Sequence, residues 1–283
     1  MSSFPALDAA ELLRRHGLRP NKRLGQNFLQ DPQVLEQITD AAALQRTDTV
    51  LEIGAGLGSL TRYLAAAAQR VVAVELDEKL IPLLKAVAGP QANVQIIHGD
   101  ILELSPAKLI DRPAYVVVAN IPYYITSAII RHLLEPVPGE TAGPRPRRIV
   151  LTVQREVAER ICALPGDLSL LALSVQVYGL PRIVARIPAA AFYPPPEVDS
   201  ALLVIDVHPQ PRIAAEHLRN FFRLIKAGFG QKRKTLRNSL SAGLHLSPAQ
   251  AEVLLRSVEI DPKRRAETLS LPEWERLAKL DLS

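Results

Sequence analysis

Short β-rich runs alternate with helical periods from residue 50 to residue 207, and this alternation restricts the possible folds more than any other feature. It is typical of a sheet whose parallel strands are joined by helical crossovers. The runs are continuously apolar, which indicates that helices cover both faces of the sheet. We therefore expect an α/β, Rossmann-like fold.

Seven strands are expected, at TVLEIG (49–54), RVVAVEL (70–76), VQIIHG (94–99), AYVVVAN (114–120), RIVLTVQ (148–154), RIVARI (182–187) and SALLVIDV (200–207). Helices are expected at 59–68, 79–88, 127–135 and 155–163, and 168–178 is interpreted as a helix with strand as an alternative. The connection 189–199 carries no helical pattern. Because a parallel crossover needs roughly a dozen residues and usually a helix, the last strand is expected to be antiparallel.

The pattern changes near residue 210. No further strand signal occurs, and helices are expected near 213–227, 231–243, 247–257 and 271–280, separated by Gly and Pro signals. We predict two domains, an α/β domain of residues 1–209 and a smaller all-helical domain of residues 210–283.

The excess of positive over negative charge lies in the second domain. The chain has a net charge of +5, and residues 211–283 contain 14 Lys/Arg against 8 Asp/Glu. This distribution favours contact with a polyanion, although a solvated basic surface is an alternative. No acidic residue interrupts 219–237. The basic residues predicted to contact the polyanion are Arg223, Lys226, Lys232, Arg233, Lys234 and Arg237.

Three phenylalanines lie among these basic residues. Phe221, Phe222 and Phe229 follow one helical face with Leu218 and Ile225. A shared face favours a role in the core over stacking on bases.

Several classes of protein are disfavoured by composition. No apolar run reaches the ~18–20 residues of a membrane span, and the N-terminus lacks the pattern of a signal peptide. Cys162 is the single cysteine, and the six histidines show no metal-ligand spacing. We expect a cytoplasmic monomer that uses neither a membrane nor a metal ion.

A glycine turn and two acids indicate a nucleoside site. LEIGAGLGSLT (51–61) places Gly54 and Gly56 between a strand and a helix, where a ligand can approach the backbone. Glu75 ends the second strand and can accept hydrogen bonds from ribose hydroxyls. Asp100 ends the third strand and can accept from an adenine amine, although either acid could instead cap a helix.

The spacing of the glycines distinguishes between cofactors. A dinucleotide site has the pattern G-x-G-x-x-G, in which the turn holds a pyrophosphate. The pattern here is G-x-G-x-G, which is more usual for S-adenosylmethionine.

The fourth strand ends in ANIPYYITS (119–127). The carboxamide oxygen of Asn120 and the carbonyl of Ile121 or Pro122 could accept both N–H groups of an adenine amine and orient its lone pair. Tyr123 could stack on the extruded base. The alternative is a strand-terminal turn with packed tyrosines.

These segments together resemble the ribosomal RNA adenine N6,N6-dimethyltransferases. The resemblance rests on NKRLGQNFL (21–29), the glycine turn, VVAVELD, HGD (98–100), NIPYYITS, LTVQREVAERI (151–161) and FYPPPEVDSALL (192–203). KAGFGQKRKTLRNSL (226–240) and RRAETLSLPEWERLA (264–278) are similar to the bacterial small-subunit branch.

That resemblance implies a class I methyltransferase with a catalytic domain and a helical RNA-binding domain. The basic residues Arg14, Arg15, Arg19, Lys22 and Arg23 separately predict a basic N-terminal arm on the catalytic domain. It implies dimethylation of two adjacent adenosines in the 3′-terminal hairpin of 16S ribosomal RNA within an immature 30S particle. The cofactor contacts that it implies are Asn27, Leu29, Gly54, Gly56, Glu75, Asp100 and Asn120, with Gly25 and Gln26 in the same motif. The catalytic residues that it implies are Asn120, Pro122, Tyr123 and Phe192, with Tyr193 as the alternative to Phe192.

One segment departs from the family pattern, and three other functions are alternatives to the one that the resemblance implies. Residues 167–175 read DLSLLALSV where relatives carry a more polar stretch, which affects an expected RNA contact. The alternatives are methylation of large-subunit RNA, a non-catalytic RNA-binding assembly factor and an NAD-dependent dehydrogenase.

Overall fold

The computed structural model describes residues 4–121, 125–135, 143–231 and 233–280. The chain forms two compact units, one of Met1–Ala158 with Arg182–Val207 and one of Glu159–Pro181 with His208–Ser283. The predicted boundary near residue 209 assigns 159–181 to the first domain, whereas the structure groups these residues with the C-terminal helices. The difference arises because α8 (Leu170–Gln176) packs against α9 (Ala215–Phe229).

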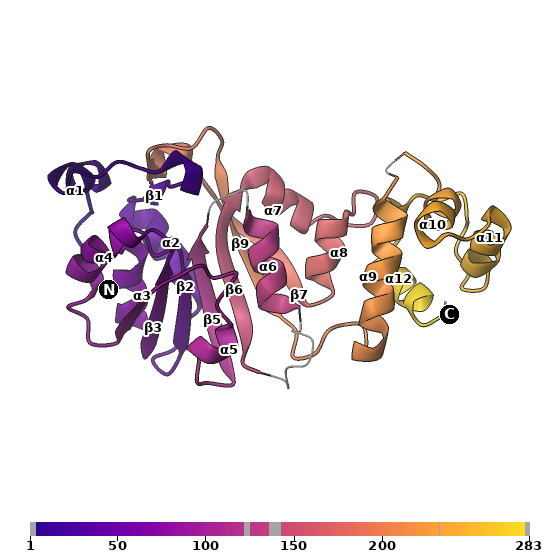
Figure 1. Ribbon diagram of the computed structural model, residues 1–283, viewed down its shortest axis with the longest axis horizontal. Coiled ribbons are helices and arrows are strands. Elements are labelled where there is room, and N and C mark those ends of the chain that lie inside the picture. Colours follow the sequence, from indigo (N-terminus) through magenta and orange to yellow (C-terminus); the bar gives the residue numbers. More distant parts are fainter. Residues whose placement is uncertain (1–3, 122–124, 136–142, 232, 281–283) are drawn as a thin grey trace. The chain divides into compact units, whose positions relative to one another are not determined.

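The first unit is built on a seven-stranded sheet with the order β4-β3-β2-β5-β6-β9-β7 (Figure 1). The strands are β2 (Thr49–Ile53), β3 (Arg70–Glu75), β4 (Val94–His98), β5 (Ala114–Asn120), β6 (Arg145–Gln154), β7 (Gly179–Ile187) and β9 (Ser200–Val207). The pairs from β4 to β6 are parallel, and β9 runs antiparallel to β6. The seven predicted strands and the antiparallel last strand are confirmed, and β9 lies between β6 and β7.

Helices cover the sheet on both faces. All five residues of β2 are buried, which requires cover on each side because successive side chains point to opposite faces. α2 packs against β5, β6 and β9, whereas α6 packs against β6 and lies in front of the strands in Figure 1. The helices between the strands of this unit are α2 (Pro32–Ala42), α3 (Ser59–Ala67), α4 (Ile81–Ala88), α5 (Pro106–Leu109), α6 (Thr126–Leu134) and α7 (Arg155–Ile161). The last residues of α7 belong to the second unit. The 3-10 turns η2 (Glu78–Leu80) and η4 (Ala189–Ala191) also lie in the connections.

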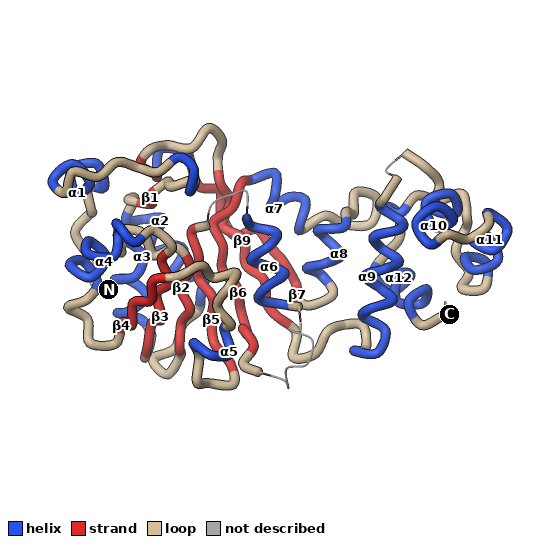
Figure 2. Tube along the Cα trace, in the orientation of Figure 1, coloured by secondary structure: helices blue, strands red, loops and turns tan. Residues whose placement is uncertain are grey.

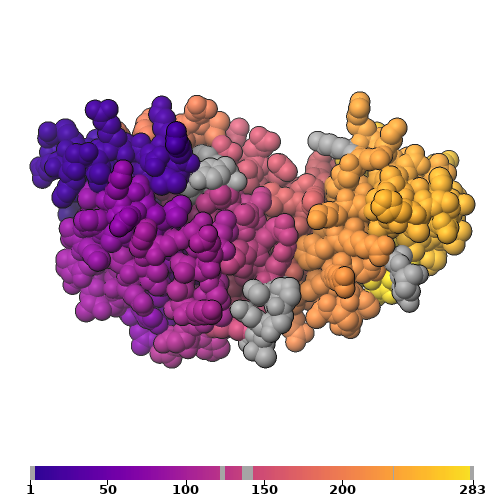
Figure 3. Space-filling view, in the orientation of Figure 1, coloured from indigo at the N-terminus to yellow at the C-terminus, as the bar shows by residue number. Residues whose placement is uncertain are grey.

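The N-terminal segment forms structure that the sequence pattern does not predict. It contains α1 (Ala9–Arg15), η1 (Lys22–Leu24) and β1 (Phe28–Leu29), and β1 pairs with β8 (Phe192–Tyr193). Ala9 and Leu13 of α1 are buried in a cluster with Phe28. These contacts fasten the segment to the first unit, where it appears in indigo in Figure 3.

The second unit is helical apart from the first residues of β7, as the colours of Figure 2 show. It contains α8, α9, α10 (Leu236–Leu244), α11 (Pro248–Arg256), η5 (Ala266–Thr268) and α12 (Leu271–Ala278). The prediction of a helix at 168–178 is confirmed. No helix among the described residues is long and apolar enough to cross a membrane.

Aromatic packing forms the centre of this second unit. Phe221 and Trp274 are completely buried, Phe222 stacks on Tyr178, and Phe229 stacks on Trp274 with 6.0 Å between ring centroids. The predicted core role is confirmed for Phe221, whereas Phe222 and Phe229 are half-buried and contact other aromatic rings. α9 therefore presents its apolar face to the core and leaves its basic residues outside.

Two of these helices approach too closely for an extra methyl group. A Cβ atom added at Gly243 of α10 would lie 2.6 Å from the Cα of Ala227 in α9. Backbone atoms cannot rotate out of the way, so we expect Gly243→Ala to destabilise the helical unit by about 1–3 kcal/mol despite its better helix propensity. Urea unfolding measures the change. Ala242→Ser, at an exposed neighbouring position, is the control, and a stabilised Gly243→Ala variant would contradict this packing.

Candidate cofactor and active site

The carboxyl ends of β2, β3, β4 and β5 surround one pocket. Its wall also includes the N-terminal segment from Leu24 to Phe28 and apolar side chains such as Ile101 and Ile129. Parallel strands present their carboxyl ends at one edge, which is where α/β proteins bind ligands. The predicted site residues that line this pocket are Asn27, Gly54, Gly56, Glu75, Asp100 and Asn120.

The glycine turn after β2 requires residues without a side chain. Gly54, Gly56 and Gly58 have φ angles of +73°, +58° and +84°, a region that other residues rarely adopt. A Cβ atom at Gly54 would lie 3.2 Å from the carbonyl oxygen of Asn120, and one at Gly56 would lie 3.3 Å from the ring of Phe28. The turn therefore keeps the pocket open and brings the ends of β2 and β5 together.

Glu75 is held at the end of β3 by backbone donors. Its Oε2 accepts the N–H of Gly56 at 2.7 Å, and its Oε1 accepts the N–H of Asp77 at 2.8 Å. Burial raises the pKa of Glu75 above its ordinary value, while these hydrogen bonds act in the opposite direction. Each carboxylate oxygen retains a second lone pair, so the group can still accept hydrogen bonds from a diol.

Asp100 lines the pocket and also accepts a backbone hydrogen bond from the turn that follows β4. Its Oδ1 accepts the N–H of Leu102 at 2.9 Å and so supports the turn that follows β4, while the residue lines the pocket. The segment that follows is a turn rather than a helix. The acid therefore shapes the loop and presents polar surface to the pocket.

Asn120 ends β5, where its carboxamide has a defined orientation. Its Nδ2 donates a hydrogen bond of 3.1 Å to the carbonyl oxygen of Asn27. Because only the nitrogen can donate to a carbonyl, Oδ1 is the acceptor end of the amide. The other predicted acceptor is the carbonyl of Ile121 or Pro122, and Ile121 is buried and lines the same pocket.

The remaining predicted residues lie elsewhere. Leu29 and Phe192 are paired across β1 and β8 and are 3% and 2% exposed, within the core. Neither residue lines the pocket at the carboxyl ends of β2 to β5, so the ring of Phe192 would have to be uncovered before it could stack on a base. Tyr193 is half-buried against the neighbouring cluster that contains Phe28. Pro122 and Tyr123 lie outside the described residues.

Comparisons with known proteins show the family to which the chain belongs. The family model of ribosomal RNA adenine dimethylase matches residues 17–280. Ribosomal RNA small subunit methyltransferase A of Dehalococcoides mccartyi strain CBDB1 is 46% identical over 280 residues, covering 98% of this chain and 94% of the relative. The chain belongs to the ribosomal RNA adenine dimethylase family.

Solved structures support the same family. A dimethyladenosine transferase from Plasmodium falciparum has a TM-score of 0.74 and 25% identity, over 88% of this chain and 95% of its own. The 23S rRNA methyltransferase ErmE has a TM-score of 0.70 and 25% identity, over 89% and 98% of the two chains. The predicted family and α/β methyltransferase fold are confirmed.

In this member of the adenine dimethylase family, a buried acid lies beside the glycine turn. Glu52 of β2 is 1% exposed and lines a small cavity with Ser59 and Asn120. Its Oε2 has no hydrogen-bond partner within the described part of the chain. Burial, with a contribution from the charge of Glu75, raises the pKa of Glu52 to about 8. The sequence signal for it is a single charged residue inside the apolar run TVLEIG.

This acid makes the stability of the protein depend on pH. Its pKa is higher in the folded state than the ordinary value of 4.5, so the stability it contributes is fully present below pH 4.5 and is lost as pH rises through about 8. Relative to Glu52→Gln, the wild type should lose about 1.4 kcal/mol of unfolding free energy per pH unit in that window. Urea unfolding from pH 5 to pH 8 measures this, with exposed Glu78→Gln as the control. If the unfolding free energies of the wild type and Glu52→Gln change with pH in parallel, Glu52 is ionised in the folded protein.

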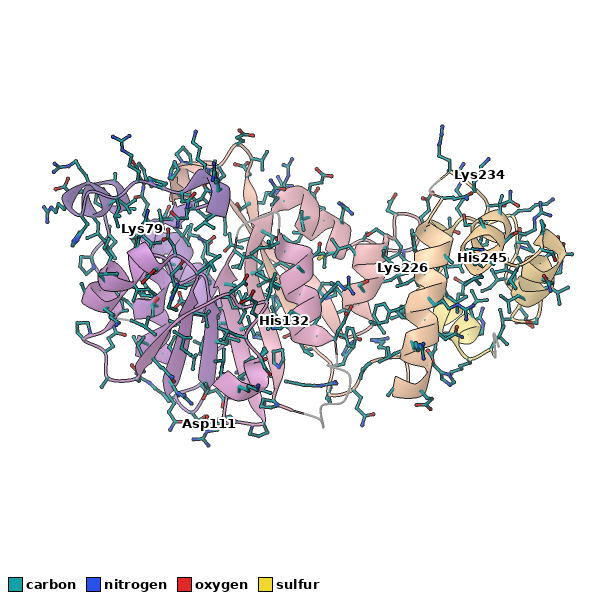
Figure 4. All side chains as sticks on the ribbon, in the orientation of Figure 1. Lys79, Asp111, His132, Lys226, Lys234 and His245 are labelled. Atoms are coloured by element: carbon teal, nitrogen blue, oxygen red, sulfur yellow. The ribbon has the colours of Figure 1, made fainter. Side chains whose placement is uncertain are left out.

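The basic cluster predicted to bind RNA lies in the second unit. Lys226 is on α9, and Lys234 is in the loop before α10 (Figure 4). Arg223, Lys226, Arg233 and Lys234 are exposed. Arg237 differs, because its Nη1 lies 3.2 Å from a carboxylate oxygen of Glu252 in α11. Lys232 lies outside the described residues.

Proposed function

We propose that this protein uses S-adenosylmethionine to dimethylate N6 of two adjacent adenosines in the 3′-terminal hairpin of 16S ribosomal RNA. It acts as a cytoplasmic monomer on an immature 30S particle during small-subunit biogenesis. Family membership supports the reaction, and the 46% identity to a small-subunit methyltransferase supports the choice of RNA. The observation that carries the proposal is the orientation of Asn120, whose amide oxygen is an acceptor at the edge of the pocket.

The residues of the pocket fit S-adenosylmethionine. The glycine turn leaves space that a Cβ atom would fill, and the two acids supply acceptors at successive strand ends. Glu75 would hold the ribose hydroxyls and Asp100 the adenine amine, between apolar walls that include Ile101. When bound, the cofactor supplies an electrophilic methyl group on a sulfonium.

Asn120 orients the amine of the target adenine. That amine is a poor nucleophile because its lone pair is conjugated with the ring. The Oδ1 of Asn120 and the carbonyl of Ile121 or Pro122 accept its two N–H groups, which directs the lone pair and favours its rehybridisation. Tyr123 stacks on the extruded base, and Phe192 completes the stack after rearrangement. No strong general base is required, because the proton leaves after N6 has been substituted.

The reaction is tested with immature small-subunit particles and radiolabelled cofactor, followed by mass spectrometry of the ribosomal RNA. We expect dimethyladenosine at two adjacent positions of the 3′-terminal hairpin. Large-subunit particles are assayed in parallel, because ErmE is named for 23S rRNA. Modification of the large subunit alone would overturn the proposed substrate, and cofactor binding without transfer to either RNA would favour an assembly factor.

Removing the carboxamide should separate chemistry from cofactor binding. We expect Asn120→Ala to lower the rate of methyl transfer by about 10²–10³-fold, in the range found when one oriented hydrogen-bonding group is lost. Affinity for the cofactor should change by less than about tenfold, because Glu75 and Asp100 remain. Single-turnover transfer and titration calorimetry measure the two effects. Asn238→Ala, at an exposed position of α10, is the control, and an unchanged transfer rate in Asn120→Ala would refute the role of Asn120.

Removing basic side chains should weaken particle binding and its salt dependence. For the triple replacement of Lys226, Arg233 and Lys234 by Ala, we expect the slope of log K against log salt to become less steep by roughly one for each phosphate that is no longer neutralised. Cofactor affinity should stay unchanged. Filter binding from 50 to 300 mM salt measures the slope. Lys279→Ala, which removes a lysine paired with Glu275, is the control. An identical slope in the triple variant would place the RNA contact elsewhere.

A further inference from the structure

One side chain ties the N-terminal segment to the end of β3. The Nε2 of Gln26 donates to the Oδ2 of Asp77 at 2.7 Å, and its Oε1 accepts the backbone N–H of Asn21 at 2.8 Å. Both ends of this amide are therefore engaged. Gln26 is partly buried and lines the pocket, so these hydrogen bonds lie beside the proposed cofactor site.

Asp77 connects this amide to the acid at the end of β3. Its backbone N–H donates to the Oε1 of Glu75 at 2.8 Å, and its Oδ1 accepts the N–H of Lys79 at 3.1 Å. The two carboxylate oxygens of Asp77 thus have different partners, the start of η2 and Gln26. Displacing Asp77 would also disturb the donor that orients Glu75.

The segment that Gln26 holds reaches the catalytic amide. The residue after it, Asn27, accepts the hydrogen bond from Asn120 through its carbonyl, and the side chain of Asn27 donates to the carbonyl of Gly25 at 3.2 Å. Residues 21–27 therefore extend between the end of β3, at Asp77, and the end of β5, at Asn120. We call these residues the bridging segment.

We infer that Gln26 is a positioning residue, which fixes the bridging segment so that the carbonyl of Asn27 aligns Asn120 while Asp77 supports Glu75. The inference deepens the proposed function and rests on it, because it assigns the target-base role to Asn120. Gln26 acts through other residues, and it couples the proposed ribose site to the proposed adenine-amine site.

The chemistry of the contact requires an amide at position 26. A glutamine can donate to Asp77 and accept from Asn21 at once, whereas an ionised carboxylate can only accept. A carboxylate there would also face the charges of Asp77 and Glu75, with Asp100 lining the same pocket. Lys22 and Arg23 on the segment and Lys79 after Asp77 are cations close in the sequence to these groups, and all three are exposed. A protonated carboxyl group restores a donor and an acceptor.

Titration calorimetry with S-adenosylhomocysteine at pH 8 and pH 5.5 uses this difference. We expect Gln26→Ala to weaken binding by about tenfold at both pH values, the loss of one hydrogen bond to a charged group. Gln26→Glu should be weakened at least as much at pH 8 and should recover most of the affinity at pH 5.5, each relative to wild type at the same pH. Exposed Gln37→Ala of α2 should match the wild type. If Gln26→Glu and Gln26→Ala lose affinity equally at both pH values, the inference is wrong.

A kinetic measurement separates positioning from simple cofactor affinity. With saturating cofactor, Gln26→Ala should still transfer methyl groups about tenfold more slowly, because Asn120 is less well aligned. Full recovery of the rate at saturation would reduce Gln26 to an affinity role and overturn the coupling. Melting temperatures of all variants, measured in parallel, identify any loss that comes from global unfolding.

Hydrogen exchange of the cofactor-free protein tests the contact independently of the reaction. Gln26→Ala should accelerate amide exchange across residues 21–27 by about tenfold, because the segment opens more often without the hydrogen bond. Unchanged exchange there would refute the contact. A wild-type protein that binds the cofactor but methylates neither ribosomal subunit would refute the proposed function while the exchange and binding results still decide the role of Gln26.

Discussion

The pairing of β2 with both β3 and β5 is the constraint on which the site depends. The chain continues from β2 to β3 and β4 on one side, and returns to the other side of β2 as β5. The parallel register places Ile53 beside Ala119, so the turn after β2 meets the residue that ends β5. A Cβ atom at Gly54 would press on the carbonyl of Asn120, and glycine is therefore needed for the two strand ends to approach. A ligand can then reach both strand ends in one crevice.

Backbone groups fix the polar side chains of this crevice. Glu75 accepts two backbone N–H groups, and Asn120 donates to a backbone carbonyl. Each side chain uses one hydrogen bond or more to hold its position and keeps further capacity for a ligand. Glu52 is buried nearby without such partners among the described residues, and it is the acid whose pKa rises to about 8. Burial raises the pKa of both acids, and the backbone donors at Glu75 oppose that rise.

The local parts of this arrangement could be predicted from the sequence, and the parts that depend on distant contacts could not. Continuous apolar runs locate the seven strands because burial on both faces leaves a local signal. β1 and β8 have two residues each, too few for any period, and Asn27 and Leu29 were inferred only from the family resemblance. The bond between Gln26 and Asp77 joins residues 51 positions apart, which leaves no pattern in either segment. Residues 159–181 were assigned to the first domain because their packing partner, α9, begins more than thirty positions later in the chain.

The net charge counted from the sequence does not show which cations of the folded protein are free of acidic partners. The folded helices pair several cations of the second unit with acids, as in Arg237 with Glu252, Arg264 with Glu273 and Lys279 with Glu275. Such pairs reduce the field that these cations present to a polyanion. Arg219, Arg223 and Lys226 of α9, with Arg233 and Lys234 of the following loop, have no acidic partner within ion-pairing distance in the described part of the chain. Five cations without an acidic partner therefore lie together on one helix and the loop that follows it. A concentrated charge of this kind can fix the register of an RNA backbone, whereas a diffuse one would only raise its local concentration.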